Sequence, residues 1–127
     1  MKKVIYLMLA ILFLVSGLAF AGQKEKIAVS AKDKIPGASV SGPVGTSRFF
    51  LLFDEKGKLI EAITNPYKEA ENPGTAVADF LASKGVTIIV ATGFGDRIVQ
   101  VMKSKGIRTV VFQGSAEEAV KKVLQPK

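Results

Sequence analysis

Apolar residues follow two different patterns along the chain, and the first of them predicts β-strands. Residues 26–30 form the first expected strand, and a loop rich in Gly, Pro, Ser and Lys covers residues 31–46. Residues 49–53 are apolar without interruption, which is typical of a strand that is buried on both faces. The turn residues Asp54 to Gly57 then join this strand to a third one, residues 59–63, in a predicted hairpin.

The second pattern begins near residue 75, where apolar positions recur at helical spacing and helices alternate with strands. Strands are expected at residues 86–91 and 107–112. The expected boundaries of the three helices are the N-caps Thr75 and Asp96, the stops Gly85 and Gly106, and the capping box Ser115 with Glu118. The order of elements is therefore βββαβαβα.

An internal repeat supports this order. The segment Ser-Lys-Gly-Val at residues 83–86 recurs as Ser-Lys-Gly-Ile at residues 104–107, and each copy leads into an apolar run. Two helix–Gly–strand units of the same kind indicate parallel strands that are joined by right-handed crossovers. The sequence predicts an α/β fold with a mixed five-stranded sheet, in which the second strand is antiparallel to its neighbours and helices pack on the sheet.

The first residues have the pattern of a signal peptide rather than of the fold. Lys2 and Lys3 precede an apolar run at residues 4–15, and Ala19 and Ala21 supply small residues for cleavage before Gly22. The run is shorter than the about 20 residues of a membrane span, so a retained anchor is the less favoured alternative. We expect residues 1–21 to be a cleaved signal peptide, residues 22–127 to be one domain, and the product to be periplasmic or secreted.

The composition of the chain excludes several kinds of active site. The formal charge is +7, and removal of Lys2 and Lys3 lowers it by two, which favours anionic partners without selecting one. The sequence has no Cys and no His, so Ser–His and Cys–His nucleophiles are excluded. A two-metal nuclease would need several carboxylates at one end of the sheet, and the aspartates do not group there. We expect no enzymatic activity.

With this order of elements, the chain resembles the dinitrogenase iron–molybdenum cofactor biosynthesis family of nitrogenase accessory and carrier domains. The matching stretches cover residues 26–30, 40–54, 65–66, the helix near Gly74, residues 85–95, and residues 105–119. The resemblance implies a ribonuclease-H-like α/β fold. It also implies a protein that binds or carries an iron–molybdenum or other metal–sulfur cluster without being an enzyme.

One motif departs from the family pattern. Where the family usually has His-Phe-Gly-Arg, this chain has Pro43-Val44-Gly45-Thr46, so only the glycine is kept. Imidazole would ligate a metal and guanidinium would hold anionic charge, and neither is present in this motif. The ligand types left to the chain are carboxylates, hydroxyls and the Met sulfur. Met102 is the single Met after the signal segment, and its helical spacing predicts a core position.

The candidate site lies where the connections of the first strand and of the strand at residues 86–91 leave in opposite directions, because ligands of open α/β sheets bind at such points. Two loops rich in Gly and hydroxyls should meet there. They supply the candidate cofactor-binding residues Ser41, Gly45, Thr46, Ser47, Gly93, Gly95, Asp96 and Arg97. The second loop opens a helix whose amides can hold an anion, although an Asp96 cap would occupy them. The alternative is that Gly93 and Gly95 only permit a tight turn.

Two functions remain open. The first is a carrier of an anionic iron–molybdenum or other metal–sulfur cofactor, and the second is a periplasmic protein-interaction module that has lost the ligand site. The basic residues of the C-terminal half could face an acidic protein partner, but they are also typical of solvated helix ends. We expect no nucleic-acid partner, and membrane contact only through the signal segment if that segment is not cleaved.

Overall fold

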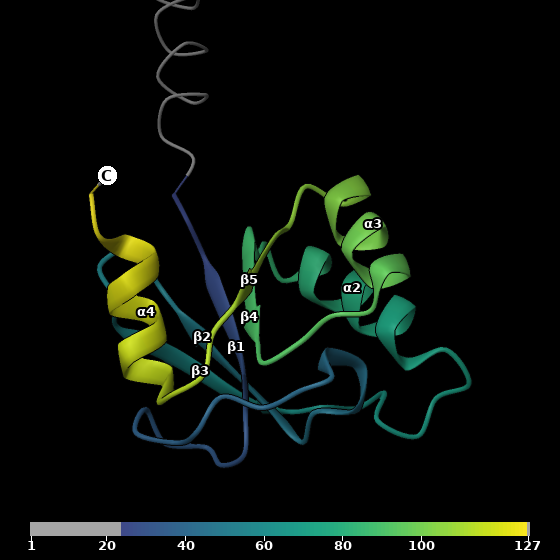
Figure 1. Cartoon of the computed structure of the whole chain (residues 1–127), viewed down its shortest axis with the longest axis horizontal. Coiled ribbons are helices and arrows are strands. Elements are labelled where there is room, and N and C mark those ends of the chain that lie inside the picture. Colours follow the sequence, from purple (N-terminus) through teal and green to yellow (C-terminus); the bar gives the residue numbers. More distant parts are fainter. Residues whose placement is uncertain (1–23, 127) are drawn as a thin grey trace, which may run out of the picture.

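The structure, a computed structural model, describes residues 24–126 (Figure 1). The predicted signal peptide, residues 1–21, lies outside the described residues. The strands are β1 (Ile27–Ala31), β2 (Phe49–Phe53), β3 (Leu59–Thr64), β4 (Ile88–Ala91) and β5 (Arg108–Val111). The helices are the 3₁₀ helix η1 (Val44–Thr46) and the α-helices α2 (Pro73–Ser83), α3 (Asp96–Ser104) and α4 (Ala116–Leu124). Between residues 24 and 126, no helix is both long enough and apolar enough to span a membrane.

The five strands form one mixed sheet in the order β3-β2-β1-β4-β5. β2 pairs antiparallel with both β1 and β3, while β1, β4 and β5 are parallel to one another. The predicted sheet and the direction of its second strand are therefore confirmed. β1 and β2 are interior strands, and their apolar residues are buried on both faces of the sheet.

Helices cover both faces of the sheet and divide the core in two. In Figure 1, α4 lies on one side of the sheet, and α2 and α3 lie on the other. Successive strand residues point to opposite faces, so Leu51 belongs to the cluster under α4 and Leu52 to the cluster under α2 and α3. Met102 is fully buried in the second cluster, as its spacing predicts.

The two Ser-Lys-Gly repeats are matching helix ends. Gly85 and Gly106 have φ values of +80° and +77°, which glycine adopts without strain. The amide after each glycine donates back into the helix, Val86 to the Leu81 carbonyl at 3.1 Å and Ile107 to that of Met102 at 2.9 Å. This arrangement satisfies carbonyls that the helix end leaves free. It also explains why β4 and β5 each begin later than the apolar runs predict.

Two predicted N-caps are wrong. α2 begins at Pro73 with Asn72 as its N-cap, three residues before the predicted N-cap Thr75, because proline at the first helical position needs no amide partner. Thr75 lies inside this helix. Asp96 is the first residue of α3, and Gly95 is the N-cap. The capping box of α4 is confirmed, with Ser115 and Glu118 each accepting the other's backbone amide at 3.1 Å.

Candidate functional site

The two predicted loops do meet at the carboxyl ends of β1 and β4. The amide of Thr92 donates to the carbonyl of Ser41 at 3.0 Å. Gly42 lies so close to the second loop that a Cβ at this position would be 2.5 Å from the Thr92 hydroxyl and 3.1 Å from the Gly93 nitrogen. The backbones of residues 41–42 and 92–93 are thus in direct contact. Contact this close requires the glycine at position 42.

The first loop uses most of its hydroxyls internally. Ser41 Oγ donates to Ser47 Oγ at 3.3 Å, and Ser47 Oγ donates to the Pro43 carbonyl at 3.0 Å. Ser47 is buried, whereas Thr46 is exposed and makes a longer bond of 3.4 Å to the same carbonyl. Of the three predicted hydroxyl residues, Thr46 is exposed, Ser41 is half-buried and Ser47 is buried.

Asn65 is a buried residue that holds this loop in place and that the sequence analysis did not select. Its Nδ2 donates to the carbonyls of Gly45 and Ser47 at 2.9 and 2.8 Å, and its Oδ1 accepts the amide of Tyr67 at 2.9 Å. One side chain therefore joins the end of β3 to η1. The sequence signal for this role was that Asn65 and Pro66 come two residues after the end of an expected strand.

Gly45 packs against the start of α2. A Cβ on Gly45 would lie 2.6 Å from the backbone nitrogen of Gly74, and a Cβ on Gly74 would meet the side chain of Ile98 in α3. Gly45 thus lets η1 approach the backbone of α2, and Gly74 leaves room for the Ile98 side chain of α3. Beside this contact is a cavity of about 150 Å³ that is lined by residues 72–75, Arg97 and Ile98.

The second loop is more open than the first. Gly93 and Gly95 have no neighbouring atom within 4 Å of a built Cβ, and Gly95, Asp96 and Arg97 are exposed. No side chain caps α3, and its first backbone bond is donated by Val99 to Gly95 at 3.1 Å. The carboxylate of Asp96 therefore does not occupy the first amides of the helix, contrary to the sequence prediction. Those amides and the Arg97 guanidinium remain as donors for an anion.

Ser30 supplies an unsatisfied group beneath these loops. It lies near the carboxyl end of β1, it is fully buried, and its backbone carbonyl accepts the amide of Ser41 at 2.8 Å. Within residues 24–126, its Oγ is the one buried side-chain oxygen or nitrogen without a hydrogen-bond partner. A buried hydroxyl without a partner is costly, and such groups often mark sites of function.

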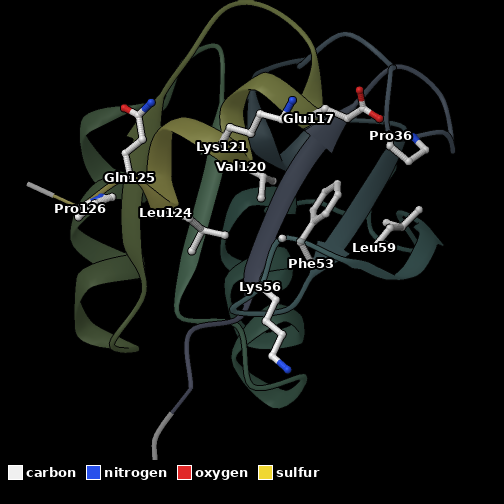
Figure 2. A pocket seen from close by; sticks show the side chains of 11 residues that line it. Pro36, Phe53, Lys56, Leu59, Glu117, Val120, Lys121, Leu124, Gln125 and Pro126 are labelled. Atoms are coloured by element: carbon white, nitrogen blue, oxygen red, sulfur yellow. The ribbon is translucent and has the colours of Figure 1, made fainter.

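A larger cavity of about 700 Å³ lies elsewhere, between α4 and the turn from β2 to β3 (Figure 2). Phe53, Leu59, Val120 and Leu124 line it, and Lys56, Glu117 and Lys121 add charges of both signs. None of the predicted site residues lines this cavity. We therefore base the candidate site on the two loops and not on cavity size.

The comparisons with known proteins agree with the fold. The sequence profile of the family described as "Dinitrogenase iron-molybdenum cofactor" matches residues 24–126. The structure is similar to the crystal structure of PH0822, with 25% identity, a TM-score of 0.67, and coverage of 78% of this chain and 88% of the other. It is also similar to the apo form of the orange protein from Desulfovibrio gigas, with 21% identity, a TM-score of 0.73, and coverage of 79% and 87%.

A third similar structure is that of a NifB-like protein from Thermotoga, with 24% identity, a TM-score of 0.66, and coverage of 78% and 86%. A search of curated proteins returned no match. The likeness to the Desulfovibrio and Thermotoga structures supports the fold alone, whereas the family profile covers all the residues that the structure describes.

Proposed function

The chain belongs to the dinitrogenase iron–molybdenum cofactor family, and we propose that it is a non-catalytic protein that binds or carries an anionic metal–sulfur cofactor of the iron–molybdenum type. The observation that supports this proposal is the direct contact between the two loops at the ends of β1 and β4. Such a junction is where open α/β sheets bind their ligands.

The residues at this junction fit an anion better than a metal ion. Between residues 24 and 126, no three His, Cys, Asp or Glu side chains gather closely enough to hold a metal. What the junction offers is the first amides of α3, the guanidinium of Arg97 and the hydroxyl of Thr46. The cofactor would thus be cargo that is held by its negative charge, with hydrogen bonds in place of protein ligands to the metal.

We further propose that the protein is exported, because of the pattern of the first residues. Lys2 and Lys3, the apolar run that follows, and Ala19 with Ala21 form the expected signal. Fractionation of the host cell, with mass spectrometry of the N-terminus, tests this proposal. A product that still begins at Met1 in the membrane fraction would contradict it.

The binding proposal is tested by adding molybdate and, separately, isolated iron–molybdenum cofactor to the anaerobically purified protein. Calorimetry and the absorption spectrum should show binding at sub-millimolar concentration. Arg97→Gln should weaken binding about tenfold, the effect expected from losing one hydrogen bond to a charged group. Arg108→Gln is the matched control, since Arg108 begins β5 at the opposite end of the sheet, and it should bind like the unchanged protein. If neither molybdate nor the isolated cofactor binds, the proposal is refuted.

A second candidate function is an exported protein-interaction module that has kept the fold without the ligand. The observation that favours it is that Ser41 Oγ already donates to Ser47 Oγ, and Ser47 Oγ donates to the Pro43 carbonyl. Pro43→His combined with Thr46→Arg restores the His and the Arg of the family motif. If binding appears only in this double variant, the second candidate is supported and the first is rejected.

A further inference from the structure

β5 is an edge strand whose outer backbone groups have no strand beside them in the described sheet. It pairs with β4 on one side only. Arg108 and Phe112 donate their amides inward, to the carbonyls of Thr87 and Ala91 at 2.8 and 3.1 Å. Backbone groups alternate in direction along a strand, so Thr109 and Val111 present their amides and carbonyls outward.

A groove lies beside this edge on each face of the sheet. On the α3 side, a cavity of about 400 Å³ is lined by Val99, Lys103, Gly106, Ile107, Arg108 and Thr109. On the α4 side, a cavity of about 430 Å³ is lined by Arg108, Val110, Lys122, Val123, Gln125 and Pro126. Figure 1 shows β5 between α4 and α3. An added strand would therefore direct its side chains alternately into the two grooves.

The other edge of the sheet lacks this arrangement. β3 has a register shift opposite Leu52 and Phe53, and such bulges disfavour the addition of another strand. Glu61 of β3 is already paired with Lys84 at 3.1 Å. In β5 the register is regular, and the exposed fraction of Val111 is 64%, so an apolar side chain is available to a cross-strand neighbour.

All charged side chains that line the two grooves are positive. They are Lys103, Arg108 and Lys122, and no carboxylate of residues 24–126 lies within 4.0 Å of their charged nitrogens. Pairing of two β5 strands would bring these cations of two copies together, which is unfavourable. Charge complementarity instead selects an acidic partner.

We propose that the free edge of β5 binds an extended acidic segment of a partner protein by strand addition. The backbone of the segment pairs with Thr109 and Val111. Its side chains alternate between the two faces, so carboxylates on one face meet Lys103 and those on the other meet Lys122, while apolar side chains fill the rest of each groove. This interaction surface is separate from the loop junction and does not depend on the proposed cofactor binding.

The test uses the product of the full-length gene, ¹⁵N-labelled and purified in the form that the cell accumulates. The probe is a short, terminally blocked peptide that repeats Glu-Glu-Val-Val, so that both faces of the added strand carry carboxylates. Its addition should shift the amide resonances of Thr109 and Val111, and the affinity should fall several-fold between about 50 and 300 mM salt. A peptide that repeats Lys-Lys-Val-Val is the control and should not bind.

Main-chain pairing is tested with two further peptides of the same sequence, one N-methylated at every second residue and the other at every residue. Alternate amides lie on opposite edges of a strand, so the first peptide keeps one edge that can pair with β5 and should bind, whereas the second has none and should not. Equal binding by both would overturn the proposal. So would the absence of shifts in β5 at about 1 mM of the glutamate peptide.

Substitutions of charged residues test which cations the peptide contacts. Lys103→Glu with Lys122→Glu should weaken binding of the glutamate peptide at least tenfold, whereas Lys32→Glu, in the loop after β1 and outside both grooves, should leave it unchanged. Arg97→Gln should not affect the peptide, which separates this result from that of the cofactor test. If Thr109 and Val111 shift with protein concentration in the absence of peptide, a second copy occupies the edge and the proposal is wrong.

Discussion

At the scale of single residues, the candidate site is organised by small and polar side chains that bond to the protein itself. Asn65 joins η1 to the end of β3, and Gly45 allows η1 to touch the backbone of α2. Ser30 is the exception, because its buried hydroxyl has no partner within the described residues. Hydrogen bonds and close backbone contacts therefore hold the first loop in place.

The role of Asn65 gives the first prediction. Asn65→Asp keeps the shape of the side chain but removes both Nδ2 donors, which leaves the carbonyls of Gly45 and Ser47 unpaired in a buried position. We expect the free energy of unfolding at neutral pH to fall by about 2 kcal/mol or more in urea titrations. Asn72→Asp is the control, since Asn72 is exposed and its side chain makes no capping bond. A similar loss in both variants would show that the Nδ2 bonds are not responsible.

The second prediction compares two glycines of the predicted site. A methyl group on Gly45 would lie 2.6 Å from the Gly74 nitrogen, and backbone cannot move aside as a side chain can. Gly45→Ala should therefore lower the free energy of unfolding by about 1–3 kcal/mol, whereas Gly93→Ala, with open space around it, should change it by less than about 0.5 kcal/mol. Thermal unfolding of both variants measures the difference. Equal stability would mean that η1 does not pack on α2 as described.

At the scale of elements, the ends of strands and helices carry carboxylates with a defined structural role. Asp54 accepts the amides of Lys58 and Lys56, each at 2.9 Å, and thereby closes the turn between β2 and β3. The amide of Lys58 is the main reason why the pKa of Asp54 lies below its usual 3.8. Likewise, the amide of Ser115 lowers the pKa of Glu118 from its usual 4.5.

The third prediction follows from the sign of these shifts. Because both pKa values are lower in the folded protein, the stabilisation is complete above the unfolded values of 3.8 and 4.5 and is lost as pH falls through the lower folded values. Asp54→Asn and Glu118→Gln should each flatten the decline of the melting temperature below about pH 4.5. Glu69→Gln is the control, since the contact of Glu69 with Lys68 is 4.0 Å long and exposed. An unchanged pH slope in the first two variants would contradict the assignment.

Sequence patterns were sufficient for the elements but not for the interior of the site. Hydrophobic periodicity, the capping box of Ser115 and the stops at Gly85 and Gly106 are local signals, and the structure bears them out. The predicted start of α2 at Thr75 is wrong because threonine is a preferred N-cap residue, whereas here Pro73 takes the first helical position, which proline also favours. The bonds of Asn65 reach 18 and 20 residues along the chain, and the isolation of the Ser30 hydroxyl depends on packing, so no local pattern encodes either feature.

At the scale of the whole molecule, one sheet separates two hydrophobic clusters that have different helices. The cluster under α4 contains Leu51, and the cluster under α2 and α3 contains its neighbour Leu52. Both leucines lie in β2 and are fully buried. Since β1 and β2 contribute to both clusters, neither cluster can lose its strands without disrupting the other.

This arrangement predicts that the two clusters unfold together. Leu51→Ala and Leu52→Ala should each lower the free energy of unfolding by about 2–5 kcal/mol, because each leaves a cavity in a fully buried position. The ring centroids of Tyr67 and of Phe80 in α2 are 5.6 Å apart, so the fluorescence of Tyr67 reports on the cluster under α2 and α3. Far-ultraviolet circular dichroism reports on all helices and strands. Both signals should give a single shared urea midpoint in each variant. A Leu51→Ala protein whose circular dichroism changes before its tyrosine signal would instead mean that α4 and its cluster unfold as an independent unit.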